Sequence, residues 1–296
     1  MTNRFKGSMA ATAAVAALFC VGLRTVAGQA PAAAAQPYAQ PRTLDGQPDV
    51  TGIWQALNSA AWDLEDHSPR LGVPGGFGVV EGGRIPYLPA ALAKKKQNFE
   101  KRSTEDPESK CYLPGVPRIT FLPFPFQILQ FPDSAVIVYE YRGITRTIPF
   151  RGQHPDPQVI DFWMGDSRAR WDGNTLVVDT GNFNEETWLD RAGNFHSDEL
   201  HVVERYTRTG PDHMTYEVTI EDPKVFSRPW KMSTPLYRRQ EKSLRLLEYE
   251  CYAYMEEEAA KGNVKLPWSR LEFEGVPQKL SESVIRRISR VIGLDR

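Results

Sequence analysis

The strongest constraint on the fold is a dense series of short segments rich in β-branched and aromatic residues, spread over residues 126–252. Segments of this kind, bounded by turn residues, are typical of β-strands. Asp172-Gly173-Asn174 and Gly210-Pro211-Asp212 each separate two of them and predict tight turns. The expected strands are residues 52–55, 126–131, 135–141, 144–150, 169–171, 175–180, 200–208, 214–221, 230–238 and 244–252.

The connections between these segments set the direction of the strands. Most are short turns, whereas a parallel pair needs a crossover connection of a dozen or more residues. The sequence therefore predicts an all-β, mainly antiparallel fold of about ten strands. An up-and-down barrel and a strongly curled sheet both satisfy this pattern.

The first strand carries Gly52-Ile53-Trp54, which resembles the Gly-x-Trp opening of lipocalin-like (calycin-type) barrels. In those barrels the Trp plugs the closed end and an Arg from a late strand lies across it. The resemblance implies a lipocalin-like barrel in which Arg238 or Arg245 fills the role of that Arg.

The N-terminus has the three-part pattern of a secretory signal peptide. Arg4 and Lys6 precede an apolar run over residues 10–23, and small residues follow up to Ala30. A run of about 14 apolar residues is too short to span a hydrocarbon core of about 30 Å. We therefore expect cleavage near residue 30, export to the periplasm or the extracellular space, and no membrane span afterwards.

The remaining chain divides by composition. Residues 31–48 are rich in Ala, Gln and Pro and predict a disordered linker, followed by a barrel domain over residues 49–254. Within it, residues 57–125 form an irregular Pro- and Gly-rich insertion whose one helix candidate runs from Pro89 to about Lys101. Residues 255–296 form a tail with a C-terminal amphipathic helix that starts near Ser281.

Removal of the signal would take Cys20 away and leave Cys111 and Cys251. Two cysteines in an exported protein favour a disulfide, with two separately buried thiols as the alternative. Such a bond would close a loop of about 140 residues, which the chain-entropy model values at about 4–5 kcal/mol.

A longer set of motifs recurs in a fixed order over about residues 45–252. It resembles a family of exported bacterial proteins of unassigned activity, so it implies secretion and a shared fold and no particular reaction. The motifs are Cys111-Tyr-Leu-Pro-Gly-Val-Pro-Arg118, Arg170-Trp-Asp-Gly-Asn-Thr-Leu-Val-Val-Asp179, His196-Ser-Asp-Glu-Leu-His-Val-Val-Glu-Arg-Tyr206, Glu217-Val-Thr-Ile-Glu-Asp-Pro223 and Arg228-Pro-Trp230.

Charge and motifs exclude several function classes. The chain has 36 Lys and Arg against 37 Asp and Glu, a balance that argues against a protein that coats nucleic acid. It lacks the Walker A, dinucleotide-binding and Cys-x-x-Cys patterns. We therefore expect a cofactor-independent protein with no nucleic-acid partner.

The densest polar cluster of the sequence lies between Asp190 and His201. His196 and Asp190 could form an acid–base pair, because imidazole titrates near neutral pH and a carboxylate can fix its tautomer. Arg191 could hold an anionic group of a substrate. The alternative is a loop that these same residues hold together structurally.

Two other chemistries are less consistent with the sequence. The spacing of His196, Asp198 and His201 matches no standard zinc motif, so we predict no metal site. Gly165-Asp166-Ser167 is similar to the Gly-Asp-Ser of serine hydrolases but lacks their context, so Asp166 is interpreted as shaping the approach to the hairpin at residue 172 and as a ligand-site candidate.

Several side chains could line a pocket at the barrel mouth. Glu217 belongs to the polar face of a strand, which could face either solvent or a wet cavity. The remaining candidates are aromatic or polar residues near the polar loop, with core packing as the alternative for the aromatic ones: Trp163, Phe183, Trp188, Phe195, Glu199 and His201.

These observations lead to three functional hypotheses. The first is acid–base chemistry, of lyase, isomerase, cyclase or hydrolase type, on a hydrophobic or aromatic small molecule inside the barrel. The second is a non-catalytic carrier of such a molecule, and the third is an envelope interaction protein. Each of the three hypotheses is compatible with assembly into a homo-oligomer.

Overall fold

The computed structural model describes residues 38–249 and 261–262, and within them it contains nine β-strands and two helices. The helices are α1 (Pro89–Glu105) and α2 (Arg118–Phe121). The strands are β1 (Gly52–Ala56), β2 (Phe126–Gln130), β3 (Ser134–Tyr139), β4 (Thr145–Pro149), β5 (Asp166–Asp172), β6 (Thr175–Gly181), β7 (His201–Arg208), β8 (His213–Glu221) and β9 (Trp230–Arg238).

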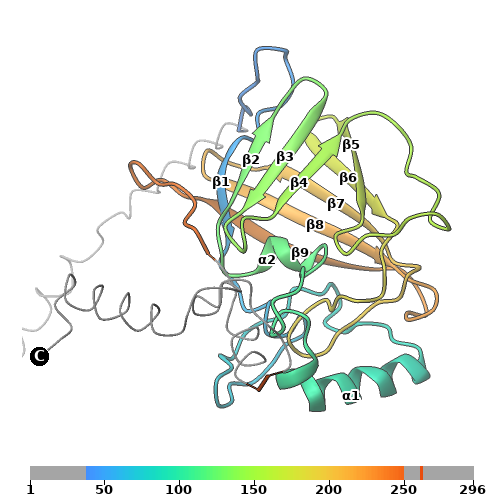
Figure 1. The fold of residues 1–296 in the computed structure, drawn as a ribbon. Coiled ribbons are helices and arrows are strands. Elements are labelled where there is room, and N and C mark those ends of the chain that lie inside the picture. The colour runs from blue at the N-terminus through green and yellow to red at the C-terminus, as the bar shows by residue number, and fades with distance from the viewer. Residues whose placement is uncertain (1–37, 250–260, 263–296) are drawn as a thin grey trace, which may run out of the picture. The chain divides into compact units, whose positions relative to one another are not determined.

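All nine strands belong to one antiparallel sheet in the order β4-β3-β2-β1-β9-β8-β7-β6-β5. Consecutive strands pair with each other except β4 and β5, and β1 joins the two halves by pairing with both β2 and β9. The sheet curls until its edge strands β4 and β5 face each other, which gives a nearly closed barrel (Figure 1). The predicted all-β fold of lipocalin-like character is thus confirmed.

Side chains from alternate positions along the strands fill the barrel interior. On β8, Met214, Tyr216, Val218 and Ile220 are buried, and the residues between them are half-buried on the other face. Neighbouring strands follow the same period of two, as expected for a sheet with one face in the core. The interior is therefore packed with side chains from every strand.

The Gly-x-Trp motif occupies its expected place, but its Arg partner differs from the expectation. Trp54 is fully buried and donates its indole N–H to the Val50 carbonyl oxygen at 3.1 Å. The guanidinium near its ring belongs to Arg208 of β7, 5.8 Å from the centroid. Arg238 instead lies beside Gly52, where a Cβ would come within 3.0 Å of its Nε. The guanidinium over the Trp54 ring thus comes from β7 and not from Arg238 or Arg245, so this part of the expectation was wrong.

The insertion, residues 57–125, gathers at one end of the barrel (Figure 1). Helix α1 starts at Pro89 as predicted and extends to Glu105, four residues beyond the predicted end. Helix α2 is buried along its whole length and contacts β1. Backbone bonds from Glu81 to Lys231 and from Ser233 to Val79 attach the insertion to β9.

Two expectations at the ends of the barrel need correction. Ordered structure begins before residue 49. The backbone N–H of Thr43 donates to the Gln47 carbonyl oxygen at 2.9 Å, and the Arg42 guanidinium donates to the Asn174 side chain at 2.9 Å. The tenth strand does not form in its described part, where Tyr249 makes only a single bridge to Tyr141. The signal peptide, the tail from residue 255, the C-terminal helix and Cys251 lie outside the described residues.

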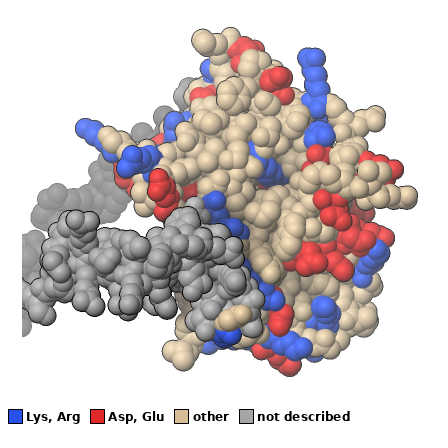
Figure 2. Space-filling view, viewed as in Figure 1, with Lys and Arg blue, Asp and Glu red and all other residues tan. Residues whose placement is uncertain are grey.

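The surface of the described chain mixes both charge signs. Figure 2 shows Lys and Arg side chains in several separate places on one face, with Asp and Glu side chains between them. Among the described helices, none combines the length and the apolar character that a membrane crossing requires.

Candidate functional site

The best candidate site is a cleft between α1 and the loop that joins β6 to β7, here called the α1 cleft. Its volume is about 540 Å³. It lies outside the barrel, against the insertion, whereas the sequence analysis expected a pocket inside the barrel. Its walls combine aromatic, charged and amide side chains: Lys94, Gln97, Asn98, Lys101, Glu105, Pro107, Lys110, Tyr112, Glu185, Glu186, Trp188, Phe195, His196 and Ser197.

His196 lies in the wall of the α1 cleft but is only 2% exposed. Its Nδ1 lies 2.8 Å from the Ser197 carbonyl oxygen, which can only accept, so Nδ1 carries the hydrogen. Nε2 then accepts from the Thr187 hydroxyl at 2.6 Å. Burial lowers the pKa of His196, which agrees with a neutral ring. Both ring nitrogens are therefore engaged by the protein.

Asp190 is fully buried and holds backbone amides in place. Its carboxylate accepts from the N–H groups of Leu64 and Ala192 at 2.8 Å each, and from the backbone and side-chain amides of Asn194 at 3.2 and 2.5 Å. Burial, and next the charge of Asp63, raise the pKa of Asp190 to about 7. The expected hydrogen bond between Asp190 and His196 is not formed, because each uses its polar atoms on neighbouring loop groups.

Arg191 points away from His196 into a second cleft. Its Nε and Nη2 donate to the two carboxylate oxygens of Glu108 at 2.8 and 2.5 Å, and its guanidinium lies 4.3 Å from the centroid of a Trp62 ring. The three residues proposed for catalysis therefore have three different surroundings. They lie close in sequence, but the structure does not aim them at one point.

Two of the expected aromatic residues do line the α1 cleft. Trp188 and Phe195 face each other through an isolated antiparallel bridge, and Phe195 stacks on Tyr87 with centroids 6.1 Å apart. Trp163 makes an edge contact at 5.3 Å with Tyr112, which also lines the cleft. Trp188 and Phe195 thus lie together in the lining of this cleft, and their contact with a ligand stays a prediction.

Three other expected ligand residues lie elsewhere. Phe183 is buried and its ring edge meets His196 at 5.7 Å. Glu199 is exposed and pairs with Lys224 at 3.2 Å. Glu217 is half-buried on the face of β8 opposite Tyr216 and Val218, so it does not line the filled interior.

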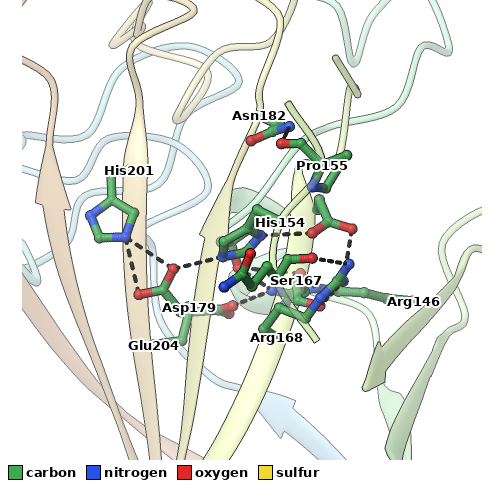
Figure 3. Close-up of polar contacts among 12 residues, drawn as sticks. Arg146, His154, Pro155, Ser167, Arg168, Asp179, Asn182, His201 and Glu204 are labelled. Atoms are coloured by element: carbon green, nitrogen blue, oxygen red, sulfur yellow. Dashed lines mark hydrogen bonds and ion pairs between the residues drawn. The ribbon is translucent and has the colours of Figure 1, made fainter. Parts of the chain in front are cut away.

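Asp166 and His201 belong to a polar chain on the outer face of β5, β6 and β7 (Figure 3). His154 of the β4–β5 loop lies 2.7 Å from Asp166 and 3.0 Å from Asp179, and His201 lies 3.1 Å from both carboxylate oxygens of Asp179. This hydrogen bond raises the pKa of His201 and lowers that of Asp179. His154 and Asp179 were not expected from the sequence, because the residues of this polar chain come from separate elements that only the fold brings together.

A second polar cluster, here called the seam cluster, lies inside the barrel where β4 faces β5 (Figure 3). Arg146 of β4 donates to Ser167 at 2.9 Å, to Thr180 at 2.8 Å and to Glu204 at 2.5 Å. Glu204 also accepts from the hydroxyls of Tyr206 and Tyr216 at 2.9 and 2.7 Å. One arginine thus bridges the open edge of the sheet to β5, β6 and β7.

Among the described residues, no three His, Cys, Asp or Glu side chains are arranged to hold a metal ion. The comparisons with known proteins add no candidate ligand, because no family model, no curated protein and no solved structure matches this chain. The two clefts beside α1 are therefore the candidate binding sites of the described chain.

Proposed function

We propose that this chain is an exported protein that binds a small aromatic molecule in the α1 cleft. The observation that carries the proposal is that Tyr112, Trp188 and Phe195 share one cleft of about 540 Å³. Ligand pockets usually span about 300–1,000 Å³ and combine aromatic walls with a few polar groups. The cleft has both properties.

The charged side chains of the cleft indicate what such a molecule would carry besides its ring. Lys94 and Lys101 come from α1, whereas Glu185 and Glu186 come from the facing loop. Lys110 is already paired with Glu105 at 3.0 Å. Opposite charges on opposite walls favour a ring with polar substituents over a plain hydrocarbon. Against a hydrocarbon, the charged side chains of the walls would lose water and gain no hydrogen bond in return.

The geometry supports binding better than turnover. A general base needs a free nitrogen within reach of the substrate, and both nitrogens of His196 are hydrogen-bonded to the loop. Asp190 is likewise engaged by four N–H groups. We therefore place the carrier hypothesis ahead of the acid–base enzyme.

A fluorescence titration with the neutral aromatic dye Nile red tests the cleft. Losing one aromatic contact costs about 0.5–1.5 kcal/mol beyond buried area, and 1.4 kcal/mol is a factor of ten in affinity. Trp188→Ala and Phe195→Ala should therefore weaken binding about three- to tenfold. Phe131→Ala, a change at an exposed aromatic residue outside the cleft, should bind like the wild type. Equal affinities for all three variants would contradict the proposal.

Export is supported by the N-terminal sequence pattern and is tested together with the disulfide. Cys111 is buried, and Arg142 donates to its carbonyl oxygen. Tyr141, the residue before Arg142, pairs with Tyr249, which precedes Cys251 by two positions in the sequence.

A protein expressed in full should be recovered outside the cytoplasm, starting near residue 30. After denaturation without reductant it should show no reactive thiol. An uncleaved chain would refute export, and two reactive thiols would refute the bond.

A further inference from the structure

We propose that the second cleft beside α1, here called the arginine cleft, binds a small molecule with an oxyanion group, a carboxylate or a phosphate, attached to an apolar body. Its volume is about 570 Å³. It is lined by Trp62, Arg70, Leu71, Val73, Glu100, Arg102, Ser103, Asp106, Glu108, Ser109 and Arg191. The proposal is independent of the α1 cleft, because the two clefts use different residues of α1.

Two of the three arginines in this cleft have no acidic partner. Arg70 and Arg102 form no ion pair with any carboxylate in the described part of the chain. Arg102 donates to the Phe99 carbonyl oxygen at 2.5 Å, which leaves most of its five N–H groups available. Guanidinium groups of this kind are the preferred protein partners of carboxylates and phosphates.

The two guanidinium groups both lie beside the ring of Phe99. The central carbon of Arg70 lies 4.6 Å from the ring centroid and that of Arg102 lies 4.1 Å from it. Two like charges at one ring repel each other. An oxyanion in the cleft that Arg70 and Arg102 both line would reduce that repulsion and accept hydrogen bonds from their free N–H groups.

Asp106 and Glu108 are committed to other arginines, and the third acidic side chain of the cleft, the exposed Glu100, forms no ion pair with Arg70 or Arg102 among the described residues. Arg118, which is fully buried, donates to both oxygens of Asp106 at 2.8 Å and to Glu108 at 2.5 Å. Glu108 also pairs with Arg191. Although burial alone would raise it, these two arginines hold the pKa of Glu108 below its usual value. The acids therefore do not neutralise Arg70 or Arg102.

The rest of the lining suits an apolar body next to the anion. Trp62 is covered on one face by Arg191, and Leu71 and Val73 belong to a tight turn closed by mutual backbone bonds between Arg70 and Val73 at 3.0 and 2.8 Å. Leu71 is fully exposed at the tip of this turn. Burying it against a ligand would gain the free energy of removing apolar surface from water.

Isothermal titration calorimetry at low salt tests the site with two probes, phenyl phosphate and benzoate. A hydrogen bond to a charged group contributes about 1.5–3 kcal/mol, and 1.4 kcal/mol is a factor of ten. Arg70→Gln and Arg102→Gln should therefore each weaken the tighter probe at least about tenfold. The tighter probe also identifies the oxyanion as phosphate or carboxylate.

Arg84→Gln is the matched control, because Arg84 is exposed, lies outside the cleft and loses the same charge. It should leave the affinity within about twofold, since exposed charges outside contact distance are screened. Trp188→Ala separates the two clefts: a loss of affinity in Trp188→Ala without a loss in Arg70→Gln and Arg102→Gln would place the probes in the α1 cleft and overturn the proposal. Circular dichroism should show that the Arg variants remain folded. Failure of both probes to bind the wild type, or an equal loss of affinity in Arg84→Gln, would overturn the proposal.

Discussion

The barrel wall and the insertion over residues 57–125 are ordered by different means. In the wall, buried and less buried residues alternate along most strands. Most strands pair with the strand that precedes or follows them in the chain. In the insertion, only two short segments are helical, yet Leu64, Val116 and Leu122 are as buried as the strand residues. Helix and strand hydrogen bonds therefore cannot satisfy most of the backbone groups that are buried in the insertion.

Individual buried polar side chains take over this role in the insertion. Arg118 joins Asp106 and Glu108, and Asp190 reaches from the β6–β7 loop to the Leu64 amide. Asp190 accepts from backbone N–H groups that an irregular loop would otherwise leave unpaired, whereas Arg118 neutralises two buried or nearly buried carboxylates. The wall needs such a device mainly at its seam, where Arg146 and Glu204 replace a missing ladder. Both clefts border the insertion, because irregular packing leaves concave surface that a filled barrel does not.

The largest effect is expected at the seam of the barrel. Glu204→Gln keeps the size of the side chain but leaves the charge of the buried Arg146 without its partner. Removing one partner of a buried ion pair costs about 3–5 kcal/mol. Urea denaturation of Glu204→Gln should therefore show a loss of this size. The double variant Arg146→Met/Glu204→Gln should recover part of it, because no unpaired charge remains.

An exposed pair on the same strands is the control for the seam. Arg205 of β7 and Asp172 of β5 lie 2.9 Å apart with 37% and 60% of their side chains exposed. Exposed pairs contribute about 0–1 kcal/mol, so Asp172→Asn should change the stability by less than that. If Glu204→Gln costs no more than Asp172→Asn, the seam cluster does not hold the barrel closed.

The sequence predicted the wall well, because a period of two is readable without knowing any partner. Nine of the expected strands formed close to their expected positions, and the Pro at the start of α1 was placed correctly. Glu204 also left a signal, since it shares its face of β7 with the apolar Val202 and Tyr206. Its partner could not be named, because Arg146 lies 58 residues away in the chain.

The candidate site was only partly predictable. Trp188, Phe195 and His196 were expected near a ligand and do line one cleft. The α1 side of that cleft, with Lys94 and Lys101, was not expected, because loops have no period that fixes which distant helix they meet. The pairing of His196 with Asp190 was expected from nearness in sequence. The structure instead joins Asp190 to Leu64, 126 residues away.

The last prediction concerns the pH dependence of the unfolding free energy, in which the insertion and the barrel wall should differ because of Asp190. Its folded-state pKa of about 7 lies above the unfolded value of about 3.9. The folded state therefore binds the proton more tightly, and the stabilisation from this group is complete below about pH 4 and is lost as the pH rises to about 7. A pKa difference of about 3 between the folded and the unfolded state corresponds to a loss of up to about 4 kcal/mol by pH 7.

Asp190→Asn removes this titration. The difference in unfolding free energy between the wild type and Asp190→Asn should be largest near pH 4 and should shrink towards pH 7, when both are measured by urea denaturation across that range. Asp161→Asn, a change at an exposed carboxyl, should show no such trend. A constant difference between wild type and Asp190→Asn would mean that Asp190 stays ionised throughout. Asp190 would then be a carboxylate at every pH tested. The stability contributed by Asp190 and that contributed by the seam cluster would then not differ in their dependence on pH.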